Sequence, residues 1–138
     1  MMSLIIRETI DDRLVDVKFD GKLNILKGNS ATGKSYLMHL IYSYIRERKN
    51  RVIGWLDYKD RDKDIKEILN HYKSIGVSLI LIDNADIFMT WELFNYLDKL
   101  GFTTIVSLKN TLLASGVKEQ KSYHVIFDKD SITLKRGV

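Results

Sequence analysis

The chain has 138 residues, of which 45% are hydrophobic and 29% charged, with a formal net charge of +4 and no cysteine. This composition is typical of an ordinary globular protein, and the length predicts one domain over residues 1–138. The absence of cysteine excludes disulfides, zinc sites built on thiolates and cysteine nucleophiles.

The surplus of positive charge does not by itself indicate a nucleic-acid-binding protein. Basic and acidic residues alternate along the chain, as in KDRDKD over residues 59–64, and such alternation is typical of solvated surface. Nucleic acid is therefore left open as a partner without being indicated. The first residues have no basic stretch followed by a long apolar one, so we expect a cytoplasmic protein that does not insert into a membrane.

Two apolar runs open the chain, at residues 4–6 and 14–19, and a polar segment over residues 8–13 divides them. They predict two antiparallel strands paired as a hairpin. Asp20-Gly21 forms the next turn, after which residues 23–27 predict a strand. Apolar residues at helical spacing then predict a helix over residues 35–48.

Between that strand and that helix, residues 28–35 read GNSATGKS and match the phosphate-binding pattern G-x-x-x-x-G-K-[ST] in full. Gly28 and Gly33 permit backbone angles that let successive N–H groups curl around a phosphate. Lys34 supplies a mobile positive charge, and the Ser35 hydroxyl at the start of the helix is placed to bind Mg²⁺. The predicted nucleotide-binding residues are Gly28, Asn29, Ser30, Ala31, Thr32, Gly33, Lys34, Ser35 and Tyr36.

The middle of the chain alternates strands with helices. Strands are predicted at residues 51–56, 78–83 and 103–108, and amphipathic helices at 60–75 and 90–100. The apolar run that ends in Asp83 is typical of a parallel strand buried on both faces. Because open α/β sheets bind ligands at the carboxyl ends of their strands, Asp83 is predicted to hold the Mg²⁺ that Ser35 also binds.

The last part of the chain predicts a closing β-hairpin, since residues 123–127 and 131–134 alternate apolar and polar side chains on both sides of a turn. Together these elements predict an α/β protein with a three-layer fold. Its sheet is mainly parallel, with antiparallel strands at the N-terminus and the hairpin at the C-terminus.

The motifs GNSATGKS and LILID, in this order of strands and helices, resemble a P-loop NTPase. Within that class the chain resembles a minimal nucleotide-binding core of the ABC-type ATPases, without their helical and signature subdomain. The resemblance implies binding of ATP, or GTP, with Mg²⁺. ABC-type enzymes usually place a Glu directly after the Asp of the acidic strand as catalytic base, but here that residue is Asn84, which cannot accept a proton at neutral pH. The family's histidine after the next strand is also missing, and upstream of the loop there is no obvious tyrosine to stack on adenine.

Other polar and aromatic residues have two interpretations each. Asp86 offers a second carboxylate one turn beyond Asp83 and is, with Lys34, the candidate catalytic group, while a structural role is the alternative. Asn110 is interpreted first as the cap of a turn and second as a contact to the γ-phosphate. Trp55 is interpreted first as a packing residue and second as a platform for the base.

Three functions fit this pattern. The first is a protein that binds ATP or another nucleoside triphosphate and hydrolyses it slowly, or only when a partner protein completes the site. The second is a small-molecule or nucleotide kinase, although the arginines of residues 46–51 lie at the far end of the first helix and cannot form a lid over the γ-phosphate. The third is a degenerate P-loop module kept for interactions, which Asn84 favours and the retained Lys34 and Ser35 oppose.

Overall fold

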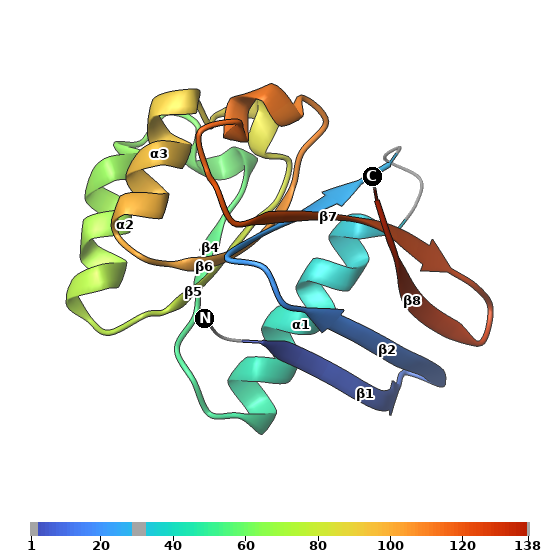
Figure 1. The fold of residues 1–138 in the computed structure, drawn as a ribbon. Helices are drawn as coiled ribbons and strands as arrows, with labels where there is room; N and C mark the ends of the chain where they lie inside the picture. Colours follow the sequence, from blue (N-terminus) through green and yellow to red (C-terminus); the bar gives the residue numbers. More distant parts are fainter. Residues whose placement is uncertain (1–2, 29–32, 138) are drawn as a thin grey trace.

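The computed structural model describes residues 3–28 and 33–137 and has a mixed α/β fold (Figure 1). Within these residues, eight strands form one sheet in the order β1-β2-β8-β7-β3-β6-β5-β4, and three α-helices flank it. The strands are β1 (Leu4–Ile10), β2 (Arg13–Phe19), β3 (Leu23–Lys27), β4 (Gly54–Leu56), β5 (Leu79–Ile82), β6 (Thr103–Ser107), β7 (Gln120–Phe127) and β8 (Ser131–Arg136). The helices are α1 (Lys34–Arg48), α2 (Ile65–Ser74) and α3 (Trp91–Lys99).

Five neighbouring strands, β7, β3, β6, β5 and β4, run parallel to one another, as the alternation of strands and helices predicts. Both predicted hairpins are present, because β1 pairs antiparallel with β2 and β7 pairs antiparallel with β8. A parallel pairing of β2 with β8, which the sequence did not predict, joins the two hairpins into one sheet. The sheet is therefore parallel over β7 to β4 and mixed in direction at the end that carries β1, β2 and β8.

The helices lie on the two faces of the parallel strands (Figure 1). α1 packs on one face through buried side chains such as Leu37 and Ile41, and α2 and α3 pack on the other through Leu69 and Phe94. Strands β1, β2 and β8 add buried side chains only to the core beneath α1. The predicted three-layer arrangement thus holds for the parallel strands, whereas in the described part of the chain no helix covers the second face of the outer strands.

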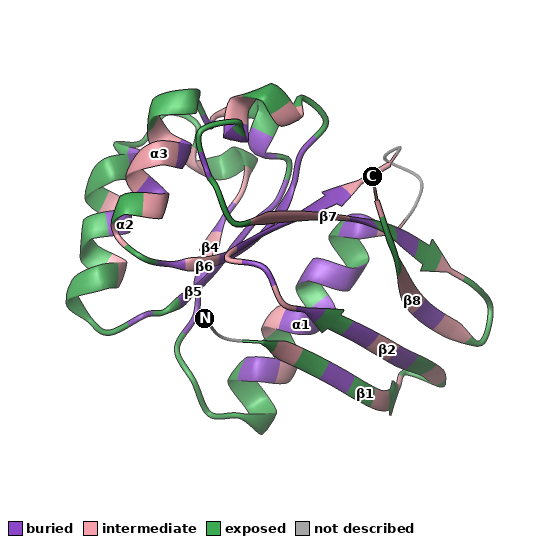
Figure 2. Cartoon of the chain, viewed as in Figure 1, coloured by how far each residue is buried: buried purple, intermediate pink, exposed green. Residues whose placement is uncertain are grey.

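Strand β1 is longer than the sequence analysis predicted. Residues 8–10, assigned there to a polar segment between two strands, continue the strand, and the turn to β2 contains only Asp11 and Asp12. Their φ angles of 51° and 65° suit the twist of a two-residue hairpin turn. Along β1 exposed positions alternate with buried or half-buried ones, and along β2 buried positions alternate with exposed or half-buried ones (Figure 2). The prediction was wrong because a strand with one face on solvent accepts polar residues.

The second predicted helix is shorter than its apolar spacing indicates. Asp57 caps a 3₁₀ turn, η2 (Tyr58–Asp60), and α2 begins only after Asp64, whose carboxylate accepts a hydrogen bond from the Glu67 N–H at 3.2 Å. The helix predicted over residues 60–75 therefore starts later, at Ile65, where Asp64 caps it. None of the helices in the described residues combines the length and the apolar character that crossing a membrane requires.

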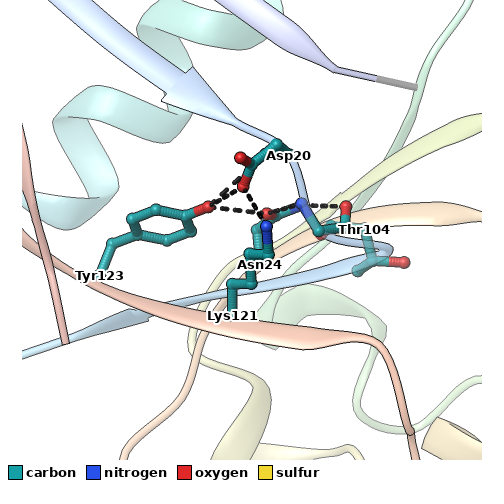
Figure 3. Close-up of polar contacts among 6 residues, drawn as sticks. Asp20, Asn24, Thr104, Lys121 and Tyr123 are labelled. Carbon is teal, nitrogen blue, oxygen red and sulfur yellow. Dashed lines mark hydrogen bonds and ion pairs between the residues drawn. The ribbon is translucent and has the colours of Figure 1, made fainter. Parts of the chain in front are cut away.

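A buried asparagine holds the amino end of β3 between its two neighbours (Figure 3). Asn24 is fully buried, and its amide nitrogen donates to the carbonyl oxygens of Gly21 and Thr104 at 2.8 and 3.1 Å. Its amide oxygen accepts a bond from the Gly21 N–H at 2.9 Å. Since a buried amide needs partners on both its oxygen and its nitrogen, these bonds fix β3 against β6 at the end opposite to the phosphate-binding loop.

Asp20 extends the same polar group toward β7 (Figure 3). Its carboxylate accepts hydrogen bonds from Lys121 Nζ at 2.9 Å and from the Tyr123 hydroxyl at 3.0 Å. The bond from Lys121, followed by that from Tyr123, holds the pKa of Asp20 below its usual range. The charged form of Asp20 is thus the one that the fold stabilises.

Candidate nucleotide-binding site

The carboxyl ends of β3, β6 and β5 lie side by side, because β6 pairs in parallel with both of the other strands. The segments that follow these strands therefore meet at one edge of the sheet. They begin with Gly28 after β3, Asp83 after β5 and Leu108 after β6. α1 begins at the same edge, and its N-terminal residues contact the segment after β5.

Gly28 and Gly33 bracket the predicted phosphate-binding loop. Their φ angles are 121° and 81°, in the region that favours glycine, and Gly33 directly precedes α1. Tyr36 lies in the first turn of α1 with 39% of its surface exposed. Four other residues predicted to bind nucleotide lie outside the described residues, namely Asn29, Ser30, Ala31 and Thr32.

Lys34 is buried at the start of α1, and its ammonium group donates a hydrogen bond to the Gly28 carbonyl oxygen. Burial lowers the pKa of Lys34, and the nearby charge of Lys109 lowers it further, while Asp86 and Asp83 act in the opposite direction. A cation that is withdrawn from water and bonded to a neutral carbonyl would gain from an anionic partner. The position of the ammonium group agrees with the predicted contact to a phosphate.

Ser35 and Asp83 are in direct contact. The Ser35 hydroxyl lies 3.1 Å from Oδ1 and 3.0 Å from Oδ2 of Asp83, whose carboxylate is buried. The sequence placed both residues at one Mg²⁺ site, and the fold brings them together across 48 residues of chain. That they bind a metal stays a prediction.

The Ser35–Asp83 pair fits a magnesium ion shared with phosphates. Mg²⁺ prefers hard oxygen ligands and is usually held by one or two carboxylates together with water and substrate phosphates. The pair offers one hydroxyl and one carboxylate of this kind. Among the described residues there is no group of three or more His, Cys, Asp or Glu side chains that could form a complete metal site without a substrate.

Ser107 belongs to the same cluster, although the sequence analysis gave it no role. Its hydroxyl donates to Asp83 Oδ1 at 2.9 Å and accepts a bond from the Asn84 N–H at 2.7 Å. Ser107 thereby orients the carboxylate and the backbone that follows it. Its only signal in the sequence is its place at the carboxyl end of a predicted strand.

Asp86 connects the segments that follow β5 and β6. Its two oxygens accept hydrogen bonds from the Lys109 and Asn110 N–H groups, each 2.8 Å long. Asn84, between Asp83 and this carboxylate, has a φ of 52°, which an asparagine tolerates better than most residues. A catalytic role for Asp86 stays a prediction, and the observed bonds are those of a residue that positions the loop after β6.

The remaining candidates have local partners. The Asn110 side chain accepts a bond from the Leu112 N–H at 3.2 Å and so caps the 3₁₀ turn η4 (Thr111–Ala114), as the first interpretation held. The Trp55 ring lies 4.5 Å from that of His39 and donates from Nε1 to Asp57 at 2.9 Å. Burial raises the pKa of Asp57, but the bonds from Trp55 and from a backbone N–H outweigh it and hold the pKa below its usual value. These contacts agree with a packing role for Trp55.

No protein-family model matches the chain, and no curated protein matches it by sequence. Among solved structures, its fold is similar to that of a KaiC-like protein from the hyperthermophilic archaeon Pyrococcus horikoshii OT3, with a TM-score of 0.58 over 86% of this chain and 78% of that chain. The two sequences are 14% identical, so the likeness bears on the fold alone. It supports a P-loop NTPase-like fold, and the narrower resemblance to ABC-type ATPases stays a prediction.

Proposed function

We propose that this protein binds ATP, or another nucleoside triphosphate, together with Mg²⁺, and hydrolyses it slowly or only with a partner protein. The observation that carries the proposal is the convergence of Lys34, Ser35 and Asp83 at the carboxyl edge of the parallel strands. The positive φ angles of Gly28 and Gly33 on either side of the loop support it as well. We expect the protein to act in the cytoplasm.

The side chains at this edge divide the binding of a triphosphate between them. Lys34 exchanges its bond to the Gly28 carbonyl for one to a phosphate oxygen, which is stronger because both groups are charged. The N-terminus of α1 adds its partial positive charge. Ser35 and Asp83 would hold Mg²⁺, which would neutralise negative charge on the phosphates. The sequence pattern assigns a further contact to the phosphates to the backbone N–H groups of residues 29–32.

Slow hydrolysis follows from the groups beside the metal-binding pair. A water molecule that attacks the γ-phosphate must be oriented, and its proton must be taken up by a nearby group. Asn84 can orient water but cannot take its proton. The two oxygens of Asp86 already accept bonds from the loop after β6, so a water molecule would have to use a remaining lone pair of this carboxylate. We therefore propose turnover well below the ~10 s⁻¹ median of enzymes for the isolated chain, and a partner protein that supplies the missing group.

The test is a calorimetric titration of Mg·ATP and Mg·GTP into the unaltered protein and into Lys34→Ala. A charge-assisted hydrogen bond contributes ~1.5–3 kcal/mol, so we expect Lys34→Ala to weaken binding at least tenfold. The matched control is Lys99→Ala, which removes an exposed lysine from α3 and should bind like the unaltered protein. Circular dichroism establishes that each variant is folded.

Two results would overturn the proposal. Equal affinity of Lys34→Ala and the unaltered protein would show that the loop does not bind the phosphates. If the unaltered protein binds neither nucleotide, the third function, a degenerate P-loop module kept for interactions, is the one that remains. Phosphate release, measured with and without DNA, separates a hydrolase from a protein that only binds the nucleotide. Transfer of phosphate to a small molecule would identify the protein as a kinase.

A further inference from the structure

Three side chains from separate parts of the chain meet beside the phosphate-binding loop. Arg13 is the first residue of β2, Tyr36 lies in the first turn of α1, and Phe127 is the last residue of β7. The guanidinium carbon of Arg13 lies 4.4 Å from the centre of the Phe127 ring and 6.0 Å from the centre of the Tyr36 ring. The two rings meet edge to face, with 5.4 Å between their centres. We refer to Arg13, Tyr36 and Phe127 as the stacking platform.

The stacking platform is in contact with the loop itself, because Phe127 packs on Gly33. A Cβ atom built on Gly33 would lie 3.0 Å from Cγ of the Phe127 ring and only 2.6 Å from its Cδ2, and the second distance is closer than side-chain atoms approach. Gly33 is therefore needed for this close approach as well as for its φ angle. The part of a ligand that extends from the loop on the side of Gly33 would therefore contact the platform.

The platform and the proposed metal site lie on opposite sides of the loop. In the sheet, β3 has β6 and β5 on one side, and these strands lead to Lys109 and Asp83. On its other side are β7, β8 and β2, which carry Phe127 and Arg13. The lysine of a phosphate-binding loop reaches the β- and γ-phosphates. The serine or threonine that follows this lysine binds the metal at the same phosphates through its hydroxyl. A triphosphate whose γ-phosphate lies toward Asp83 therefore has its nucleoside toward the platform.

The chemistry of the platform suits a flat, uncharged ring. Nucleobases stack on aromatic rings and on the plane of a guanidinium group. The guanidinium group of Arg13 is held by its contact with the Phe127 ring and by a bond from its Nε to the Lys129 carbonyl oxygen at 3.2 Å. The Tyr36 ring is held by a bond from its hydroxyl to Asp11 at 3.4 Å. Such prior ordering reduces the entropy that binding a base would cost.

There is also open space beside the platform. A groove of about 320 Å³ lies between α1 and the end of the β1–β2 hairpin, and Tyr36 and Asp11 form part of its wall. Ile10 and Leu40 add apolar surface to it. The groove shares Tyr36 with the platform and so leaves space next to that ring.

We propose that the stacking platform binds the base of the nucleoside triphosphate, with Arg13 and Tyr36 against the base and Phe127 supporting Arg13. This inference rests on the proposed function, because the phosphates bring the nucleoside to the platform. Stacking uses the face of the base and not its hydrogen-bonding edge, so ATP and GTP bind with similar affinity.

The test compares calorimetric titrations of Mg·ATP, Mg·GTP and Mg·tripolyphosphate, which carries the phosphates without a nucleoside. Arg13→Ala and Tyr36→Ala are each expected to weaken binding of both nucleotides by about tenfold, the effect of losing a stacking contact, and to leave Mg·tripolyphosphate unchanged. Arg13→Lys keeps the charge and loses the plane, so it should weaken nucleotide binding as Arg13→Ala does. Tyr36→Phe keeps the ring but loses the bond to Asp11, so it should weaken nucleotide binding less than Tyr36→Ala does. Arg7→Ala, which removes an exposed arginine from β1, is the matched control.

Each alternative result overturns the inference in a recognisable way. Full affinity in Arg13→Lys would show that Arg13 acts through its charge alone. An equal loss for Mg·tripolyphosphate would show that the variants act on the loop. If the unaltered protein binds Mg·tripolyphosphate as tightly as Mg·ATP, the nucleoside makes no contact, and the platform is refuted while the phosphate site stands. If neither ligand binds, the proposed function has failed as well.

Discussion

Replacing Asp86 with asparagine tests whether this residue holds the loop after β6. Both carboxylate oxygens accept backbone N–H bonds, from Lys109 and Asn110, at 2.8 Å each. Asparagine presents one oxygen and one NH₂ group in the same place. In Asp86→Asn one of the two N–H groups therefore faces a donor in place of an acceptor.

The size of the effect follows from these two bonds. A hydrogen bond to a charged acceptor contributes ~1.5–3 kcal/mol, and the exposure of Asp86 reduces this through solvent screening. We expect the free energy of unfolding to fall by about 1–2 kcal/mol. For a chain of this size that corresponds to a decrease in Tm of roughly 3–8 °C.

Two measurements check the expectation. Thermal unfolding followed by circular dichroism gives the change in Tm, and hydrogen exchange by NMR should show that the Lys109 and Asn110 amides lose protection. The control is Asp62→Asn, because the Asp62 side chain is 95% exposed and lies 3.8 Å from Arg61. It should change neither quantity. Unchanged Tm and unchanged exchange in Asp86→Asn, together with loss of phosphate release, would refute the positioning role and identify Asp86 as a catalytic carboxylate.

Three further substitutions test other parts of the molecule. Asp83→Asn is expected to abolish the Mg²⁺ dependence of triphosphate affinity without preventing folding, and unchanged dependence in titrations with and without Mg²⁺ would place the metal elsewhere. Asn84→Glu is expected to raise the rate of phosphate release at least about 100-fold. It should also lower the free energy of unfolding by about 1 kcal/mol, because residue 84 has a φ of 52°. An unchanged rate would show that this side chain does not reach the attacking water. Because the pKa of Asp20 is lowered from 3.8, its contribution to stability is complete above about pH 4 and is lost as the pH falls through the lowered pKa. Asp20→Asn should flatten the acid side of the stability curve measured by denaturant titration, and an unaltered acid side would contradict this.

Much of the phosphate-binding edge can be predicted from local sequence. The pattern GNSATGKS predicts the loop because its four fixed positions suit two special backbone angles, a charge and a proposed metal ligand. Gly28 and Gly33 have the positive φ angles that this requires. The run LILI predicts β5 because a parallel strand between two layers of helices is apolar on both faces, and all four residues are buried. The contact between Ser35 and Asp83 then follows from the shared direction of β3 and β5.

The other contacts depend on which strands are neighbours, and apolar spacing does not carry that information. Ser107 reaches Asp83 only because β6 lies between β3 and β5. The bonds from the loop after β6 to Asp86 have the same origin. Arg13 meets Phe127 because β8 brings the N-terminal hairpin beside β7. No local pattern in the sequence predicts these long-range pairings.

The parallel pairing of β2 with β8 has a consequence for the order of events during synthesis. Residues 14–16 of β2 pair with residues 131–133 of β8, so the β1–β2 hairpin leaves the ribosome long before its neighbour in the sheet exists. In that interval one side of β2 exposes unpaired N–H and C=O groups next to apolar side chains, an arrangement that favours association with other chains. Pairing across so much intervening chain also slows folding, because a large loop must close first. The nascent hairpin therefore carries an open strand edge until β8 has been made.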